Sequence, residues 1–409
     1  MIVPLKEQMD VIRKGSVDLL PEDELAEKIE NSIKMKKPLR VKLGCDPSKP
    51  DLHIGHAVVL HKMREFQDLG HTAVLIIGDF TAMIGDPTGK NKTRPQLSIH
   101  ETKINGQTYL EQATKILSED RLEIKYNSEW LSKMNFQNVI HLAANYTVAQ
   151  LLERDDFSKR YKSGTPISVH ELLYPLAQAM DSVAIESDVE LGGTDQKFNL
   201  LVGREIQKNH GVSPQCILTM PILEGTDGVE KMSKSLNNYI AMTDVPREMF
   251  GKAMSVPDEL IVRYYKYGGW APDEEVRKME NGLKDGSVHP RDAKVKMAQS
   301  IVELYHSKQA AEDALEEFEK MFRKKDIPDD IPEMSFNMES TKVLLANVLV
   351  KTKLVQSKKE ARRMIQQGAV SVDDEKIKDP FAEIDFSEEM IIKVGKRKFM
   401  KVRIASILK

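Results

Sequence analysis

Residues 40–78 read RVKLGCDPSKPDLHIGHAVVLHKMREFQDLGHTAVLIIG, and this stretch decides the fold class. Residues 40–43 predict a short strand, and the apolar run 73–78 predicts a buried one. Between them, apolar residues recur on one helix face from about residue 54 to 69, and Gly70 ends the pattern. A strand, a helix and a strand in this order form a βαβ unit, which predicts a parallel sheet with a right-handed crossover.

The rest of the chain predicts more helices, one more strand and a second folded region. Helices are expected at about 101–117, 136–153, 170–184 and throughout 247–322, and a strand at 215–220. The prolines and charges of 325–332 indicate a linker. Because 409 residues exceed a single core, we expect several domains. These are an α/β, Rossmann-like parallel-sheet domain (1–228), a lysine-rich loop with a helical domain (229–325), a linker (326–339) and a small α+β module (340–409).

Composition excludes several classes of protein. Hydrophobic residues make up 41% and charged residues 30%, which is typical of soluble globular chains. The first 15 residues are charged throughout and lack the apolar core of a signal peptide, and no apolar run approaches the ~18 residues of a membrane span. Cys45 and Cys216 are isolated, so they indicate neither a disulfide framework nor a zinc site. We expect a cytoplasmic protein with no membrane association and no bound metal.

Charge is unevenly distributed along the chain. Residues 340–409 hold 16 Lys and Arg against 9 Asp and Glu, a balance of +7, whereas the whole chain has a net charge of −3. A basic end on an acidic body favours a nucleic-acid contact at that end. A solvated lysine-rich surface explains the charge equally well.

Two short signatures carry the clearest chemistry. His53-Ile54-Gly55-His56 opens a predicted helix, where unpaired N–H groups and the helix dipole favour phosphate, and Gly55 lets a ligand approach the backbone. Lys231-Met232-Ser233-Lys234-Ser235 lies in a polar loop next to glycines, and such lysines can close on a triphosphate. Taken alone, each signature is more often a pair of ordinary surface histidines or a solvated loop of lysines. Together and in this order they predict a nucleoside triphosphate site.

A turn after the second strand lies where α/β proteins bind ligands. Gly85-Asp86-Pro87-Thr88-Gly89-Lys90 resembles a phosphate loop but lacks the Walker spacing. A plain Pro/Gly turn with an Asp cap is the other interpretation. Lys90 and Arg94 would add positive charge near the triphosphate.

Two polar groups predict a pocket for a small polar ligand. Tyr174, Gln178 and Asp181 are four and three residues apart, so they share one helix face, and their apolar neighbours favour a half-buried pocket. Residues 191–196, LGGTDQ, are interpreted as a Gly-rich turn with an acid and an amide. Such groups suit a ribose and an amino-acid head group.

Taken together, these motifs resemble those of the class I aminoacyl-tRNA synthetases and, within that class, the bacterial tyrosyl-tRNA synthetases. The resemblance runs from about residue 30 to the end. Tryptophanyl enzymes share the fold but neither the helix triple nor the C-terminal module. The resemblance implies an ATP-dependent, AMP-forming ligation of L-tyrosine to tRNA(Tyr), with Mg²⁺ accompanying ATP and a homodimeric enzyme.

The resemblance also implies individual roles. The catalytic groups are His53, His56, Lys231, Lys234, Lys90 and Arg94. The ATP and adenylate site comprises Gly44, Asp46, Gly55, Gly192, Asp195 and Lys234. In the tyrosine site, Asp181 would accept a hydrogen bond from the substrate phenol, and the ammonium group would be held by Asp86, Tyr174 and Gln178. Gln196 would lie near the carboxylate, and Asn127 and Trp130 near the pocket.

Residues 357–372 resemble the alpha-L RNA-binding module of a ribosomal protein and of pseudouridine synthases. A basic helix, a glycine stop and a strand offer a cationic face to a folded RNA backbone. The residues expected to contact tRNA phosphates are Lys358, Lys359, Arg362 and Arg363.

Two positions depart from the family pattern, and one of them, Val59 in place of a polar residue found near the ATP in some members, should matter little. Better-known members carry a phenol-binding tyrosine two residues before the glycine of the first strand, and here that position is Lys42. Either Asp181 carries more of the selectivity, or another residue substitutes. Two other functions remain: a non-catalytic RNA-binding or regulatory paralogue, and a small-molecule nucleotidyltransferase. Retention of the whole site disfavours the first, and the basic tail disfavours the second.

Overall fold

The computed structural model describes residues 3–47, 51–87, 99–234, 236–325, 331–338, 340, 342–373, 375–387, 389–395 and 398–407. Lys90, Arg94 and Ser235 lie outside these ranges. The chain divides into two compact units, 1–315 and 316–409.

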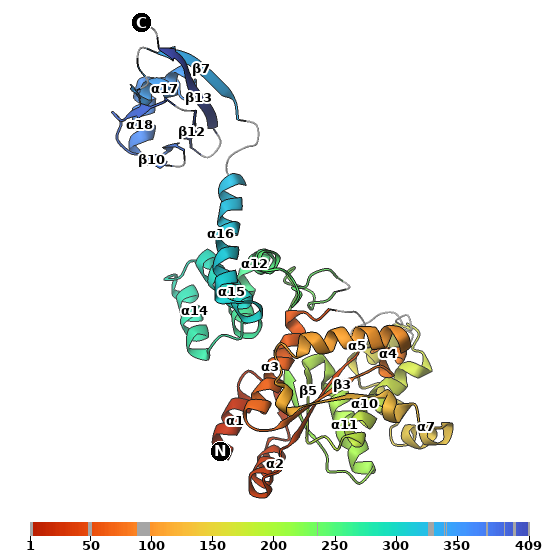
Figure 1. The fold of residues 1–409 in the computed structure, drawn as a ribbon. Helices are drawn as coiled ribbons and strands as arrows, with labels where there is room; N and C mark the ends of the chain where they lie inside the picture. The colour runs from red at the N-terminus through yellow and green to blue at the C-terminus, as the bar shows by residue number, and fades with distance from the viewer. Residues whose placement is uncertain are drawn as a thin grey trace. The chain divides into compact units, whose positions relative to one another are not determined.

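The first unit is built on a six-stranded sheet (Figure 1). Its strands, in spatial order, are β1 (Asp18–Leu20), β6 (Cys216–Met220), β5 (Val189–Gly193), β2 (Arg40–Cys45), β3 (Thr72–Ile77) and β4 (Leu122–Tyr126). The strands from β2 to β6 pair in parallel, which confirms the expected parallel sheet, and β1 adds an unexpected antiparallel edge. Strand order reverses between β2 and β5, and ligands of open α/β sheets bind at such a switch point.

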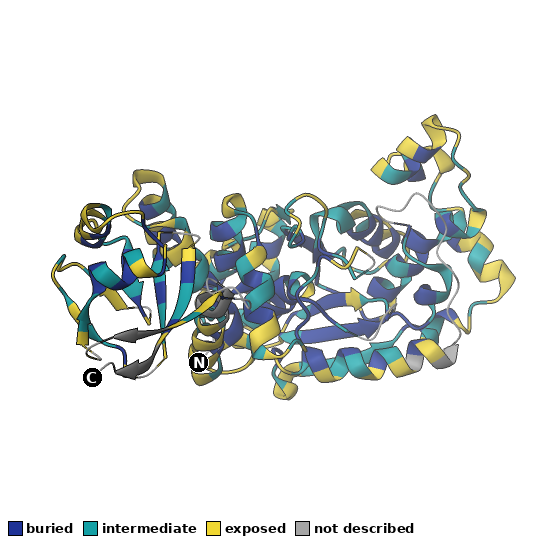
Figure 2. Cartoon of the chain, turned by 90° about the horizontal axis from the view of Figure 1, so that it is seen from above, coloured by how far each residue is buried: buried dark blue, intermediate teal, exposed yellow. Residues whose placement is uncertain are grey.

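Helices cover the sheet on both faces, which explains its apolar strands. They include α1 (Leu5–Arg13), α2 (Glu22–Met35), α3 (Ile54–Asp68), α5 (Ile99–Ala113), α10 (Val169–Ala184) and α11 (Lys197–Asn209). Residues 73–77 of β3 are at most 1% exposed. Continuous burial of this kind is typical of parallel strands covered on both faces, and the sheet appears dark blue in Figure 2.

The prediction of one continuous helix at 136–153 is wrong. The structure has α7 (Phe136–Ala143) and α8 (Val148–Leu151), flanked by α6 (Ser128–Leu131) and α9 (Asp155–Lys162). Thr147 begins the second helix because its Oγ1 accepts the Gln150 N–H at 3.2 Å, while Gln150 Oε1 accepts the Thr147 N–H at 2.8 Å. This reciprocal capping starts a new helix in the middle of the apolar pattern.

After the six-stranded sheet the chain continues as helices, as expected. They are α12 (Pro246–Ser255), α13 (Ile261–Arg263), α14 (Asp273–Asp285), α15 (Pro290–Tyr305) and α16 (Lys308–Lys325). A π-helical segment, Tyr264–Gly268, continues α13.

The C-terminal unit is an α+β module. A five-stranded sheet has the order β10 (Glu375–Ile377), β9 (Val370–Val372), β12 (Met390–Val394), β13 (Lys398–Ile407) and β7 (Glu333–Met338). A second pair joins β8 (Lys342–Leu344) to β11 (Glu383–Asp385), and the helices are α17 (Leu345–Lys351) and α18 (Lys358–Gln366). The linker expected at 326–339 therefore extends too far. Residues 333–338 form β7, which pairs in parallel with β13. The last proline that could interrupt a strand is Pro332.

Candidate active site

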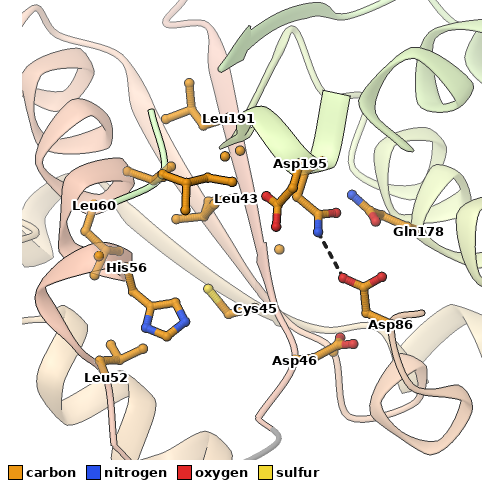
Figure 3. A pocket seen from close by; sticks show the side chains of 18 of the residues that line it. Leu43, Cys45, Asp46, Leu52, His56, Leu60, Asp86, Gln178, Leu191 and Asp195 are labelled. Atoms are coloured by element: carbon orange, nitrogen blue, oxygen red, sulfur yellow. Dashed lines mark hydrogen bonds between the residues drawn. The ribbon is translucent and has the colours of Figure 1, made fainter. Parts of the chain in front are cut away.

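A cavity of about 700 Å³ opens at the carboxyl ends of β2 and β5 (Figure 3). The expected residues that line it are His53, Gly55, His56, Gly44, Asp46, Asp86, Tyr174, Gln178, Asp181, Gly192, Asp195, Gln196, Lys231 and Lys234. The two signatures and the polar helix face therefore meet in one site. Leu52 and His56 lie on one side of it, and Gln178 and Asp86 on the other.

Asp181 is a buried carboxyl group of α10 in the wall of the cavity. It is 3% exposed and accepts hydrogen bonds from Trp130 Nε1 at 2.9 Å and from Asn127 Nδ2 at 3.3 Å. Asn127 and Trp130 thus reach the site through Asp181 rather than by lining it. Burial raises the pKa of Asp181 to about 7, although the Lys42 charge and these two donors act in the opposite direction.

Tyr174 connects the α10 face to the end of β2. Its hydroxyl donates to Asp46 Oδ2 at 2.8 Å, and Thr81 Oγ1 donates to Asp46 Oδ1 at 2.7 Å. A Cβ at Gly78 would lie 2.1 Å from Asp46 Oδ1, so only glycine leaves room for this carboxylate. Burial raises the pKa of Tyr174 well above its usual value, and the hydroxyl keeps its proton.

Asp86 lies in an ion pair that the sequence did not reveal. Arg154, the N-cap residue of α9, is 4% exposed and approaches Asp86 Oδ1 at 3.1 Å. Asp86 Oδ2 accepts from Gln196 Nε2 at 2.9 Å, which Figure 3 marks. Arg154 also donates to Asn199 Oδ1 at 3.1 Å. No motif includes Arg154 or Asn199, so only the fold identifies them.

The histidine signature starts α3, with His53 as its N-cap. The two imidazole centroids are 3.7 Å apart, and the His53 backbone N–H donates to His56 Nδ1 at 3.3 Å. Nδ1 of His56 is therefore the acceptor, which leaves the proton on Nε2. Burial, with the nearby lysines, lowers the pKa of His56 to about 3 and that of His53 well below its usual value. Both rings are neutral donors at neutral pH.

Lys231 and Lys234 of the lysine loop line the cavity and contact side chains from other elements. Lys231 Nζ lies 3.0 Å from Asp195 Oδ2, and Lys234 Nζ lies 3.4 Å from the Tyr109 hydroxyl. Asn238 orders the loop, since its Oδ1 accepts the Ser233 N–H at 2.8 Å. Neither Tyr109 nor Asn238 was found from the sequence, because each acts from outside the signature.

The basic C-terminal helix presents its cations to solvent. Lys358, Lys359, Arg362 and Arg363 are all exposed, while Ala361 and Ile365 of the same helix are buried. Ser357 caps α18, because its Oγ accepts the Glu360 N–H at 3.2 Å. The helix is therefore amphipathic, with a polar face that is largely basic.

Among the described residues, no cluster of three or more His, Cys, Asp or Glu is placed to hold a metal ion. Cys45 and Cys216 are free thiols, and burial raises the pKa of Cys45 to about 12. No helix in the described ranges is long and apolar enough to cross a bilayer.

Comparison with known proteins agrees with this geometry. A family model described as tRNA synthetases class I (W and Y) matches residues 34–323, so the chain is a member of that class. A model for the tyrosine–tRNA ligase SYY-like C-terminal domain matches residues 323–402. Solved tyrosyl-tRNA synthetases share the fold: that of Aeropyrum pernix has TM-score 0.63 at 20% identity, covering 78% of this chain and 100% of its own. That of Archaeoglobus fulgidus, complexed with L-tyrosine, has TM-score 0.63 at 24% identity, covering 76% and 100%.

Curated relatives narrow the class to one family. The tyrosine–tRNA ligase of Salinibacter ruber is 53% identical over 403 residues, covering 98% of this chain and 97% of its own. That of Thermotoga maritima is 53% identical over 397 residues, covering 97% of each. The chain therefore belongs to the tyrosine–tRNA ligases. This similarity supports the ligase and not the non-catalytic paralogue.

Proposed function

We propose that the cavity activates L-tyrosine with ATP and then transfers the tyrosyl group to tRNA(Tyr). The observation that carries this proposal is a buried Asp181 carboxylate in the same cavity as the N-terminus of α3 and the lysine loop. A buried acceptor suits a phenol O–H, and a helix N-terminus beside two lysines suits a triphosphate. One pocket thus joins both substrates of an adenylation.

The first step forms the adenylate. A tyrosine carboxylate oxygen attacks the ATP α-phosphorus, and the bond to the β-phosphate oxygen breaks to release pyrophosphate. Nε2–H of His56, with His53, donates to phosphate oxygens as charge builds on the leaving group, and Lys231 and Lys234 neutralise it. In the second step, the terminal ribose hydroxyl of tRNA attacks the carbonyl carbon, loses its proton and displaces AMP.

Different groups of cavity residues position the tyrosine and the adenylate. Asp181 accepts a hydrogen bond from the phenol hydroxyl, and Gln196 lies near the carboxylate. The ammonium group is held by Asp86, Tyr174 and Gln178. Gly44, Gly55, Gly192, Asp46 and Asp195 line the adenylate. Lys90 and Arg94 join the phosphate site as expected from sequence, although both are outside the described residues.

Mg²⁺ enters with ATP in this proposal. Mg²⁺ usually keeps several waters and binds one or two carboxylates together with substrate phosphates. Asp46 and Asp195 are the pocket carboxylates on the adenylate side, so they fit this role. The ion would neutralise phosphate charge, and no zinc takes part.

We further propose that residues 1–325 contain two functional parts, catalytic over 1–228 and tRNA-contacting over 229–325, in a cytoplasmic enzyme. The module at 340–409 binds RNA through α18.

The enzyme acts as a homodimer without membrane association. Exposed apolar residues of α7 support the dimer, because Phe136 is 80% and Ile140 53% exposed on one face. Phe136→Glu with Ile140→Glu should convert dimer to monomer in light scattering. An unchanged mass would place the interface elsewhere.

The decisive test is tyrosine-dependent exchange of labelled pyrophosphate into ATP without tRNA. Phenylalanine and tryptophan serve as controls. Exchange with tyrosine alone is the expected result. Exchange with none of the three would contradict the proposed chemistry, and equal exchange with phenylalanine would contradict the assignment of Asp181.

A further inference from the structure

Lys42 lies behind the tyrosine pocket and does not line it. Its side chain is 0% exposed, yet it carries an ammonium group 2.8 Å from Glu190 Oε1, which is 1% exposed. Nζ also donates to the Gln178 carbonyl oxygen at 3.0 Å and to Ser182 Oγ at 2.7 Å. The three donors of the ammonium therefore meet three acceptors, two of them on α10.

Glu190 passes this constraint to the side chain of Gln178. Its Oε1 accepts from Gln178 Nε2 at 3.1 Å, and its Oε2 accepts from Ser182 Oγ at 3.2 Å and from Gln215 Nε2. An ionised carboxylate can only accept hydrogen bonds, so the amide nitrogen of Gln178 must face it. The amide oxygen then points the other way, where Asn199 Nδ2 donates to it at 3.0 Å.

We propose that Lys42 is a positioning residue for tyrosine: paired with Glu190, it fixes the amide of Gln178 so that its oxygen serves the substrate ammonium. This inference rests on the proposed tyrosine site. A cation is needed because a buried charge without a partner is strongly destabilising. Without the ammonium of Lys42, Glu190 would lose its ion-pair partner, and the Gln178 amide would lose a fixed acceptor on this side. The lysine at this position thus acts through Gln178 on the ammonium end of the substrate, and its charge also favours the ionised form of Asp181.

The surrounding packing is shaped around the pair. A Cβ at Gly203 of α11 would lie 2.5 Å from Gln215 Nε2 and 3.2 Å from Glu190 Oε2. Glycine at this helical position therefore makes room for the network. Gln215 has 0% and Ser182 0% exposed surface, so water does not replace these contacts.

The test compares Lys42→Met with Lys62→Met. Lys62 is also 0% exposed and ion-paired, with Glu65, but it lies outside the cavity lining. Inhibition constants are measured in pyrophosphate exchange for tyramine, which keeps the ammonium, and for 3-(4-hydroxyphenyl)propionate, which lacks it, together with KM for tyrosine and for ATP. Both variants are checked for folding by circular dichroism and melting temperature.

Lys42→Met should raise KM for tyrosine and weaken tyramine binding about tenfold, the effect of one charge-assisted hydrogen bond. Propionate binding should weaken less than tyramine binding, KM for ATP should change less than about twofold, and Lys62→Met should change none of these. Equal weakening of tyramine and propionate, or no change in either, would overturn the inference. Absence of exchange in the unsubstituted enzyme would instead contradict the proposed function. If Lys42→Met does not fold, Gly203→Ala replaces it with the same expected pattern.

Discussion

The two ends of the cavity differ in how far their polar groups are already paired. At the tyrosine end, Asp181 accepts from two donors, Asp86 is paired with Arg154, and Gln178 is held on both sides. At the proposed phosphate end, Nδ1 of His53 is buried and has no hydrogen-bond partner among the described residues, and Lys231, although paired with Asp195, is 40% exposed. The comparison indicates that the tyrosine site is preorganised, whereas the phosphate site is completed by ATP.

The largest effect is expected at the phosphate end. Lys234→Ala should lower kcat for tyrosine activation by about 10²–10³, because it removes charge that stabilises the transition state. The tyrosine dissociation constant should stay within about twofold. Stopped-flow adenylate formation and equilibrium tyrosine binding measure the two quantities. Lys278→Ala, at a lysine 72% exposed outside the cavity, is the control. Equal loss of tyrosine binding would remove the distinction between the two ends.

At the tyrosine end, substitution should change selectivity. Asp181→Ala should reduce the preference for tyrosine over phenylalanine by about 10–100-fold, since a charge-assisted hydrogen bond contributes roughly 1.5–3 kcal/mol. Exchange kinetics with both amino acids give the ratio, and activity with phenylalanine provides the internal control. An unchanged ratio would exclude Asp181 from phenol recognition.

The basic helix should affect neither end of the cavity. Arg362→Glu with Arg363→Glu should weaken tRNA binding at least about tenfold and lower its salt dependence, because phosphate contacts release counterions. Pyrophosphate exchange in the same variant should remain as in the unsubstituted enzyme. Equal losses in exchange and in aminoacylation would indicate a folding role for α18.

The smallest effect concerns pH. The pKa of Asp181 is raised to about 7, so the carboxylate forms as pH rises through that value and becomes a stronger acceptor for the phenol. Tyrosine affinity should therefore rise a few-fold from about pH 6 to pH 8, with Lys42 and Glu190 as the neighbouring charges. Calorimetric titration across this range is the measurement, and Asp181→Asn should give a flat profile. A flat profile for the unsubstituted enzyme would contradict the titration.

The same shift has an opposite sign for stability. The folded state holds the Asp181 proton more tightly than the unfolded chain, in which the carboxyl group has its ordinary pKa of 3.8. Its contribution to stability is present below about pH 4 and is lost as pH rises toward about 7. The buried carboxylate thus destabilises the fold where it serves binding best.

Sequence patterns predicted the site where local spacing determines it. Tyr174, Gln178 and Asp181 share a helix face whatever the rest of the fold, and the βαβ unit places His56 at a helix start. The glycines of residues 191–196 predict a turn, whereas residues 191–193 belong to strand β5. Val189 and Leu191 of this strand are buried. The prediction missed it because Gly192 and Gly193 end a real strand.

Partners across the fold could not be predicted in this way. Arg154 meets Asp86, 68 residues away in sequence, and Lys42 meets Glu190 through two neighbouring parallel strands. These pairs depend on strand order and helix packing, which no local period encodes. The neutral state of the histidines likewise arises from burial, which the motif alone does not reveal.

Tyrosine binding without ATP or tRNA tests the comparison most directly. Isothermal titration of the unsubstituted enzyme should show tyrosine binding by itself, with the affinity changing less than about threefold when a non-hydrolysable ATP analogue and Mg²⁺ are added. Tyrosine binding that appears only after the analogue is present would contradict a preorganised tyrosine site.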